Sequence, residues 1–462
     1  MTPVHYLSIG ELQEAFRQGI YGPVEVTEAA LERIAEVDPK LKAFITVTGD
    51  VARRQAEVAE REMRADGPKS PLHGVPIALK DLCDTAGIAT TGGTMAWKDR
   101  VPGVDATVVR RLADAGAILL GKLAMTEGAF IEHAPGMPEP VNPWRAGHMT
   151  GLSSSGPGVA TAAGLAYGTL GSDTGGSIRF PSALCGVTGL KPTWGRVSRA
   201  GILPLAESLD HIGPMTRTVA DAAAVLGVIA GHDPADPTSL TAKVPDYVAR
   251  IGRTVKGVRI GIDEAYCTDG VDLELRDSVI GSVAVFQKLG AEVKRVSMPS
   301  VDAFIAHFSD MVSIEAAASN AEALLPVKQQ LGPVYRGVLE RGSELSAKFY
   351  AQLRQAALRY AGGLQALFED VDLILCPSWP TPAVEITADA LGDVEDQGGL
   401  LRFTGPFNFS GSPTLSIPSG FNADGLPLGL QLVGRHLEEE VLCRVGHAYQ
   451  QTTDWHKRFP PV

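Results

Sequence analysis

Short apolar segments alternate with helical patterns along this sequence, and that alternation restricts the fold more than any other feature. From residue 71, an apolar run is followed by a helical pattern that ends at Gly116, and another apolar run comes next. The same order returns from residue 256. Strands that alternate with helices form an α/β sheet. The segments are GVPIAL, ATVVRRLADAG, AILLG, KGVRIGI, LELRDSVIGSVAVFQKLG, AEVKRVSMP and VDLILCP.

Length and charge bear on the number of domains and on the kind of partner. The chain has 462 residues, which at about 150 residues per domain allows three domains or one unusually large one. Its net charge of −12 disfavours nucleic acid and anionic membranes as partners and favours a small molecule. Hydrophobic residues make up 45% and charged residues 20%, which excludes wholesale disorder.

Cysteine usage and the N-terminus point to a reducing compartment. The five cysteines include no close pair, so neither a disulfide framework nor a zinc site is indicated, and no metal or other cofactor is expected. The N-terminus lacks a basic segment followed by an apolar stretch, and no run approaches the ~18 apolar residues of a membrane span. We therefore expect a cytoplasmic protein.

Three segments could carry chemistry, and each also has a structural interpretation. In GSDTGGSIR, glycines before Ser177 let backbone N–H groups converge beside a hydroxyl, as in a nucleophile with an oxyanion hole, but a plain turn or an anion cradle fits too. The run SSS at 153–155 predicts a helix cap. Lys80 ends an apolar strand. Side chains alternate along a strand, so Lys80 and Asp81 would point to opposite faces of the sheet. The Lys80 amine would then lie away from the charge of Asp81, and burial would lower its pKa. The alternative is a surface position, where most lysines lie.

Together these segments resemble the amidase signature family. Its lysine motif, GxPxxxKD, corresponds to GVPIALKD, and its signature block to residues 151–215, through GSDTGGSIRFPS, CGVTGLKPTWGRVS and SLDHIGPM. Further matches at GKLAMTEGAF, LCPSWPTPA and GLPLGLQLVGR extend the resemblance over nearly the whole chain. The resemblance implies a Ser-cisSer-Lys triad. Ser177 would be the nucleophile, Ser153, 24 positions earlier, the bridging serine, and Lys80 the base.

The same resemblance implies the architecture. The expected fold is a single large α/β domain over residues 1–462, in which helices cover a mixed, twisted central β-sheet. Its expected parts are a helical N-terminal layer at 1–70, a catalytic core at 71–225, a variable helical substrate-pocket region at 226–370, and a return to the sheet at 371–462.

The loop that holds the bridging serine departs from the family pattern. Leu152 stands where the family usually has glycine, and the family's cis peptide would here join Leu152 to Ser153. Ser155 replaces a glycine and Pro157 replaces a serine. These changes keep the three catalytic side chains and alter the expected shape of the pocket beside them.

The resemblance implies a stand-alone hydrolase of carbon–nitrogen bonds in carboxylic amides, which acts through a serine acyl-enzyme and for which carbamates or aryl esters are further substrate options. Two alternatives stay open: the glutaminase-type component of an amidotransferase built from several different chains, and a protein that uses the glycine loop only to bind an anion. The expected partner is a small molecule, with no nucleic acid and no membrane, and a homodimer is an option. The oxyanion-hole candidates are Thr174, Gly175, Gly176 and Ser177.

Substrate contacts are expected from segments that vary in the family. Several aromatic and apolar side chains in them suggest an apolar or aromatic acyl group, with ordinary core packing as the alternative for each. We also expect Arg179 to pair with an acidic neighbour such as Asp173. The substrate-binding candidates are Met125, Glu127, Phe130, Leu152, Phe304, Phe308, Met311 and Trp379.

Overall fold

One mixed β-sheet of eleven strands runs through residues 2–386 and 397–462, which the computed structural model describes. Its strands are β1 (Phe44–Val47), β2 (Pro76–Lys80), β3 (Ile118–Leu123), β4 (Gly168–Asp173), β5 (Thr188–Lys191), β6 (His211–Thr216), β7 (Arg259–Ile262), β8 (Glu292–Arg295), β9 (Leu373–Pro377), β10 (Thr414–Phe421) and β11 (Pro427–Gly434).

The strand order is β1-β3-β2-β4-β6-β5-β10-β11-β9-β7-β8. The pairs β2/β3, β2/β4, β7/β8 and β7/β9 are parallel, and the remaining neighbours are antiparallel. Because the chain forms a single α/β domain around this mixed sheet, the predicted fold class is confirmed.

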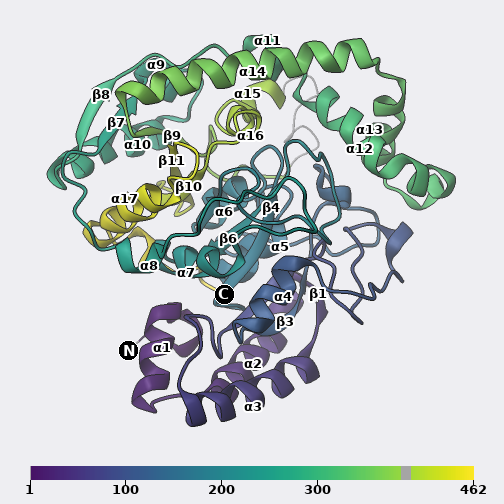
Figure 1. Ribbon diagram of the computed structural model, residues 1–462, viewed down its shortest axis with the longest axis vertical. Coiled ribbons are helices and arrows are strands. Elements are labelled where there is room, and N and C mark those ends of the chain that lie inside the picture. Colours follow the sequence, from purple (N-terminus) through teal and green to yellow (C-terminus); the bar gives the residue numbers. More distant parts are fainter. Residues whose placement is uncertain (1, 387–396) are drawn as a thin grey trace.

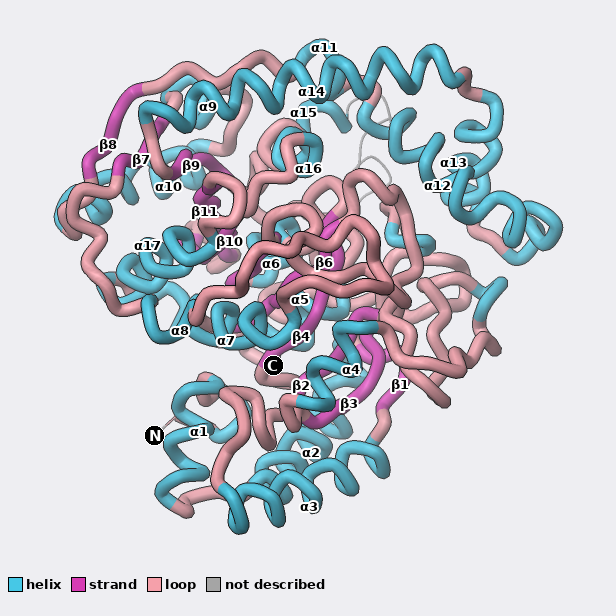
Figure 2. Tube along the Cα trace, in the orientation of Figure 1, coloured by secondary structure: helices cyan, strands magenta, loops and turns pink. Residues whose placement is uncertain are grey.

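Helices cover the sheet (Figure 1). The first three lie together at the N-terminal end, and the long helix α14 lies at the opposite end of the view, with loops gathered between them around β4 and β6 (Figure 2). The helices are α1 (Ile9–Gln18), α2 (Pro23–Leu41), α3 (Gly49–Asp66), α4 (Thr107–Asp114), α5 (Ser155–Ala162), α6 (Arg179–Cys185), α7 (Val219–Ile229), α8 (Tyr247–Arg250), α9 (Glu264–Thr268), α10 (Leu273–Lys288), α11 (Asp302–Ile305), α12 (Phe308–Leu324), α13 (Pro333–Glu344), α14 (Ala347–Asp370), α15 (Gln397–Leu401), α16 (Gly405–Phe409) and α17 (Glu439–Thr452).

The two strands that matter most for function lie side by side in the sheet. Every residue of β2 and of β4 is buried, as expected of parallel strands that are covered on both faces. The register pairs Ile77 with Gly168 and Leu79 with Leu170. Because the two strands are parallel, their carboxyl ends meet at one edge of the sheet. This register places Lys80, the last residue of β2, near the loop that follows β4.

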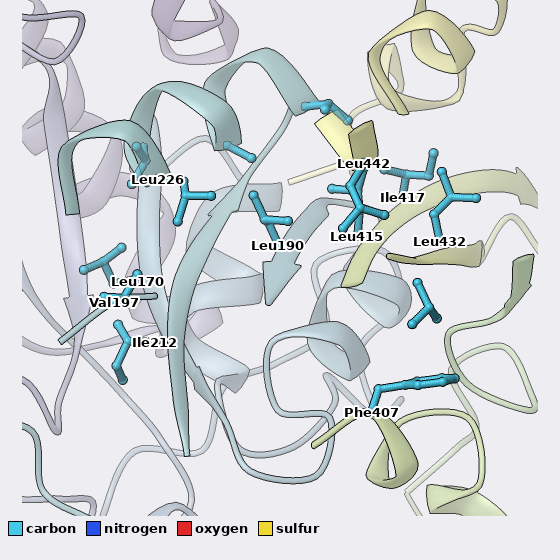
Figure 3. Packing of buried hydrophobic residues seen from close by; sticks show 14 of the residues in the cluster. Leu170, Leu190, Val197, Ile212, Leu226, Phe407, Leu415, Ile417, Leu432 and Leu442 are labelled. Carbon is cyan, nitrogen blue, oxygen red and sulfur yellow. The ribbon is translucent and has the colours of Figure 1, made fainter. Parts of the chain in front are cut away.

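Strands β10 and β11 pack on buried apolar side chains of the C-terminal helices. Leu415 and Ile417 of β10 and Leu432 of β11 are fully buried and pack near Leu442 of α17, and Phe407 of α16 lies below them (Figure 3). Burial of one such side chain contributes roughly 1.5–3 kcal/mol. This packing anchors the C-terminal segment, which returns to the sheet beside β5.

One local feature differs from the sequence expectations. A capping box of Ser8 and Glu11 starts α1 in the segment 1–70, but this segment, expected to be a helical layer, also contains β1, which pairs with β3. Its sequence, FITV, consists of residue types that favour strands.

No helix in the described ranges is both long and apolar enough to cross a membrane.

Candidate active site

Lys80 is the centre of a buried cluster of hydroxyl groups. Its side chain is fully buried at the end of β2. The Nζ atom lies 2.7 Å from Oγ of Ser153, 3.0 Å from Oγ of Ser154 and 2.8 Å from Oγ of Ser172. Within the described part of the chain, Lys80 forms no ion pair. An amine in such a place has polar neighbours but no opposite charge to hold its proton.

The electrostatic consequence is a lowered pKa. Burial lowers the pKa of Lys80 from 10.5 to about 7, and the negative charges of Asp173 and Asp210 oppose that shift only in part. A neutral amine is therefore well populated near pH 7, and a neutral amine can accept a proton.

The carboxylate that follows Lys80 in sequence is kept away from it. Asp81 accepts hydrogen bonds from the backbone and hydroxyl of Thr91, and its Oδ1 lies 3.5 Å from Nζ of the buried Lys122. Lys80 and Asp81 therefore have separate partners, as the alternation of side chains along a strand predicts. The pairing with Lys122 supplies the opposite charge that a buried Asp81 carboxylate requires.

The serine run 153–155 does not cap a helix, which corrects that expectation. Ser154 precedes α5 but makes no side-chain capping bond, because its hydroxyl accepts from Lys80 and donates to the carbonyl of Ser172. Ser155 lies 3.3 Å from Nε2 of His133. The peptide bond between Leu152 and Ser153 is cis. All three hydroxyls thus serve tertiary contacts.

Ser177 lies in a loop between β4 and α6 with several unused hydrogen-bond donors. Among residues 2–386 and 397–462, the backbone N–H groups of Thr174, Gly175, Gly176 and Ser177 donate to no protein acceptor, and the Ser177 hydroxyl has no hydrogen-bond partner. Ser177 is 8% exposed and lines a cavity. This loop can bind a negatively charged oxygen beside a hydroxyl.

The two loop glycines are required by aromatic rings that cover them. A Cβ atom on Gly175 would lie 2.7 Å from the ring of Phe308, and one on Gly176 would lie 2.2 Å from the ring of Phe180. Gly176 also has a φ of 140°, which side chains other than glycine rarely adopt. The rings therefore pack directly on the backbone that carries the N–H groups.

A buried ion pair supports this loop from behind. Asp173 receives two hydrogen bonds from Arg179, at 2.9 and 2.8 Å, and one from the Asn408 amide at 2.8 Å. Burial alone would raise the pKa of Asp173, but the Arg179 guanidinium outweighs that effect and holds the pKa well below its usual range. Oδ2 of Asp173 also accepts from the N–H of Ile178. The expected pair between Arg179 and Asp173 forms.

A second carboxylate holds the loop from the other side, and sequence reasoning missed it. Asp210 accepts from the Thr174 hydroxyl at 2.5 Å and from the N–H groups of Leu205 and Ala206. Burial raises the pKa of Asp210 to about 6. Its position inside the matched segment SLDHIGPM was the available signal. Asn408 gave no comparable signal, because it stands far away in sequence and outside every matched segment.

The cavity beside Ser177 is apolar. None of the lining side chains among the described residues carries a charge, and the polar ones are Thr174, Ser177 and Ser309. Its remaining walls are formed by Ala129, Phe130, Ile131, Leu152, Gly175, Phe180, Leu205, Phe308, Val312, Trp379, Leu400 and Leu401.

Four of the predicted substrate contacts, Phe130, Leu152, Phe308 and Trp379, lie on this wall. The structure does not bring the other four to it. Met125 and Met311 are buried in the core. Phe304 packs edge-on against Tyr360 and Phe409.

Glu127 also faces away from the cavity. Its carboxylate accepts from the Thr94 hydroxyl and from the N–H of Gly332, which ties the short 3-10 helix η3 (Glu127–Ala129) to the start of α13. Burial raises the pKa of Glu127.

Within the described residues, no group of three or more His, Cys, Asp or Glu side chains is arranged to hold a metal ion.

Comparisons with known proteins agree on one family. A family model described as Amidase matches residues 25–443. The Mycobacterium tuberculosis protein named "Putative amidase AmiD" is 43% identical, over 99% of this chain and 96% of its own length. The A component of the glutamyl-tRNA(Gln) amidotransferase from a Roseiflexus species is 41% identical, over 100% of this chain and 99% of its own.

A solved structure is similar along the whole chain. The peptide amidase from Stenotrophomonas maltophilia superposes with a TM-score of 0.86 and 32% identity, covering 100% of this chain and 99% of that one.

Replacing Arg179 with methionine tests the support behind the loop. Arg179→Met leaves the buried Asp173 carboxylate without its cation, so we expect a loss of roughly 3–5 kcal/mol in the free energy of unfolding, measured by urea denaturation. Arg295→Met is the matched control, because the ion pair of Arg295 with Glu264 is exposed and such pairs contribute at most about 1 kcal/mol. Equal losses in the two variants would contradict this account of Asp173.

Proposed function

This chain belongs to the amidase family, and from that membership we propose that it is a stand-alone hydrolase that cleaves the carbon–nitrogen bond of carboxylic amides through a serine acyl-enzyme. The observation that carries the proposal is the buried amine of Lys80, 2.7 Å from the Ser153 hydroxyl, together with a Ser177 hydroxyl and N–H groups that have no partner among the described residues. A base, a bridging hydroxyl and a nucleophile are the parts that such a reaction needs.

Acylation starts with two linked proton transfers. The Ser177 hydroxyl gives its proton to Oγ of Ser153, while Ser153 passes its own proton to the neutral Nζ of Lys80. The Ser177 oxygen then bonds to the substrate carbonyl carbon, and the π electrons of the carbonyl move onto its oxygen. The lowered pKa of Lys80, about 7, makes this amine a suitable base near neutral pH.

The oxyanion so formed needs hydrogen-bond donors at a fixed position. The N–H groups of Thr174, Gly175, Gly176 and Ser177 are assigned this role, because they have no other acceptor among the described residues. The pairs that hold the loop, Asp173 with Arg179 and Asp210 with Thr174, would keep the donors in place. Loss of one such donor typically lowers the rate about 10²–10³-fold.

Collapse of the tetrahedral intermediate reverses the relay. The carbon–nitrogen bond breaks, the leaving nitrogen takes a proton from Ser153, and the Lys80 ammonium replaces that proton. Water then attacks the acyl-enzyme by the same route, which releases the carboxylic acid and restores the Ser177 hydroxyl. Carbamates follow the same steps, and with an aryl ester the carbon–oxygen bond breaks and the phenolic oxygen takes the proton from Ser153. Neither a metal nor another cofactor is assigned a step.

The cavity favours an uncharged substrate with an apolar acyl group. Phe130, Phe308 and Trp379 offer aromatic walls, and the described lining has no charge to bind an ionic group. Moving an unpaired charge into such a site costs several kcal/mol. We therefore propose linear amides of apolar acids as the substrate class.

The alternative is the glutaminase-type component of an amidotransferase, which the 41% identity to such a protein supports. A glutaminase must hold the ammonium and carboxylate groups of glutamine, and the described cavity lining provides no charged partner for either. We therefore favour the stand-alone enzyme, acting in the cytoplasm on a small molecule, alone or as a homodimer. All five cysteines are free and buried, which accords with a reducing compartment.

Labelling with a fluorophosphonate tests the nucleophile and the base without knowledge of the substrate. We expect intact-mass spectrometry to find one adduct on the wild type, none on Ser177→Ala, and labelling at least about 100-fold slower for Lys80→Ala, because the nucleophile then lacks its base. Ser182→Ala is the matched control, since it removes a buried hydroxyl that donates to the Ile178 carbonyl. An adduct that persists in Ser177→Ala, or none on folded wild type, would refute the proposed nucleophile.

A pair of substrates separates the two candidate functions. We expect kcat/KM for phenylacetamide to exceed that for L-glutamine by at least about 100-fold, because burial of an aromatic group contributes roughly 1.5–3 kcal/mol and the charges of glutamine stay unpaired. Ammonia release from the purified chain, without added partners, is the measurement. A preference for L-glutamine would overturn the stand-alone assignment.

A further inference from the structure

Leu152 lines the cavity and is joined directly to the bridging serine, Ser153. Its side chain lines the cavity together with Ser177 and Thr174, and a cis peptide bond links it to Ser153. The amidase signature pattern usually has glycine at this place, so a leucine adds four carbon atoms to the wall. The position of those atoms depends on how firmly the backbone of Leu152 is held.

Both neighbours of Leu152 are fixed. Gly151 has a φ of 84°, and a Cβ atom on it would lie 2.5 Å from the backbone nitrogen of Pro181, so this segment lies directly on the backbone at the start of α6. On the other side, the Ser153 carbonyl accepts from the N–H of Thr126 at 3.3 Å, and its hydroxyl accepts from Lys80. The backbone of Leu152 therefore has no room to move away from the cavity.

The side chain of Leu152 is also held by packing against its neighbours. It packs against a cluster that includes Met149, Phe180 and Trp379. The rings of Phe180 and Trp379 meet edge to face, with centroids 4.4 Å apart. Phe180 also covers Gly176, in the loop between β4 and α6 that holds Ser177. A side chain held by such packed rings acts as a firm wall, because close-packed interiors yield little to added volume.

The proposed reaction defines which part of the substrate meets this wall. When the carbon–nitrogen bond breaks, the leaving nitrogen must take its proton from Oγ of Ser153, so it must lie within hydrogen-bond reach of that atom. Any substituent on the nitrogen therefore extends into the space around Ser153. Leu152, which is joined directly to Ser153, is the cavity-lining residue nearest to Ser153 in sequence, whereas Phe308 and Leu205 line the cavity from α12 and from the segment held by Asp210.

We propose that Leu152 closes the leaving-group side of the site and restricts this enzyme to primary amides, which release ammonia. This inference rests on the proposed function and adds to it the substrate class: primary amides of apolar acids. A hydrogen on the leaving nitrogen fits beside the leucine, whereas a propyl group needs the volume that the side chain fills. With glycine at position 152, that volume would be open.

The test compares two substrates with the same acyl group, phenylacetamide and 2-phenyl-N-propylacetamide. For the wild type, kcat/KM is expected to favour the primary amide strongly. In Leu152→Gly, and to a smaller degree in Leu152→Ala, the ratio of the two kcat/KM values should fall at least about tenfold, the range that a few methylene groups in an apolar pocket control. Leu152→Ala, the smaller change, keeps the test valid if the glycine variant does not fold.

Leu205→Ala is the matched control, because it removes the same side-chain volume from another residue that lines the cavity, and it should change the ratio less than about threefold. A fluorophosphonate adduct on Ser177 of each variant reports an assembled triad. An unchanged ratio in labelled Leu152 variants, an equal fall in Leu205→Ala, or equal wild-type rates on both amides would overturn the role of Leu152 and leave the proposed function standing. Absence of both hydrolysis and the adduct in the wild type would instead refute the proposed function.

Discussion

The rest of the site depends on the burial of one lysine amine that no described residue pairs with an opposite charge. Lys80 is fully enclosed at the end of a central strand, and three hydroxyl groups surround its Nζ atom. Nearby carboxylates have partners of their own: Asp81 pairs with Lys122, and Asp173 pairs with Arg179. Asp173 and Asp210 still raise the pKa of Lys80 in part, but neither forms an ion pair with its amine, so burial outweighs their attraction. Burial without a direct ion pair is what allows a neutral amine.

The sheet and the aromatic rings place the remaining groups around that amine. Parallel pairing of β2 and β4 brings Lys80 to the edge where the glycine loop begins. Phe308 and Phe180 then pack on Gly175 and Gly176, so the loop that carries the free N–H groups is also one wall of the apolar cavity. In the proposed reaction, recognition of an apolar acyl group and stabilisation of an oxyanion would therefore share one rigid backbone segment.

The sequence predicted the fold class through its alternating apolar and helical segments, whereas only the resemblance to the amidase signature family grouped Lys80, Ser153 and Ser177 into one site. It failed where tertiary contacts decide. The hydroxyls of 153–155 were expected to cap a helix, yet Lys80 and His133 are their partners. Phe304 was expected at the cavity and lies in the core, because residue type alone does not tell which side of a helical segment faces the site. Asn408 reaches Asp173 only through folding.

A direct titration of Lys80 tests the central claim most directly. In protein labelled with 13C-lysine, the Cε resonance that disappears in Lys80→Met belongs to this residue, and its shift can be followed with pH. We expect a midpoint near pH 7, since burial lowers the pKa of Lys80 to about 7, with the neutral amine above that pH. A resonance that keeps the shift of a charged amine up to about pH 10, as for an ordinary lysine, would contradict it.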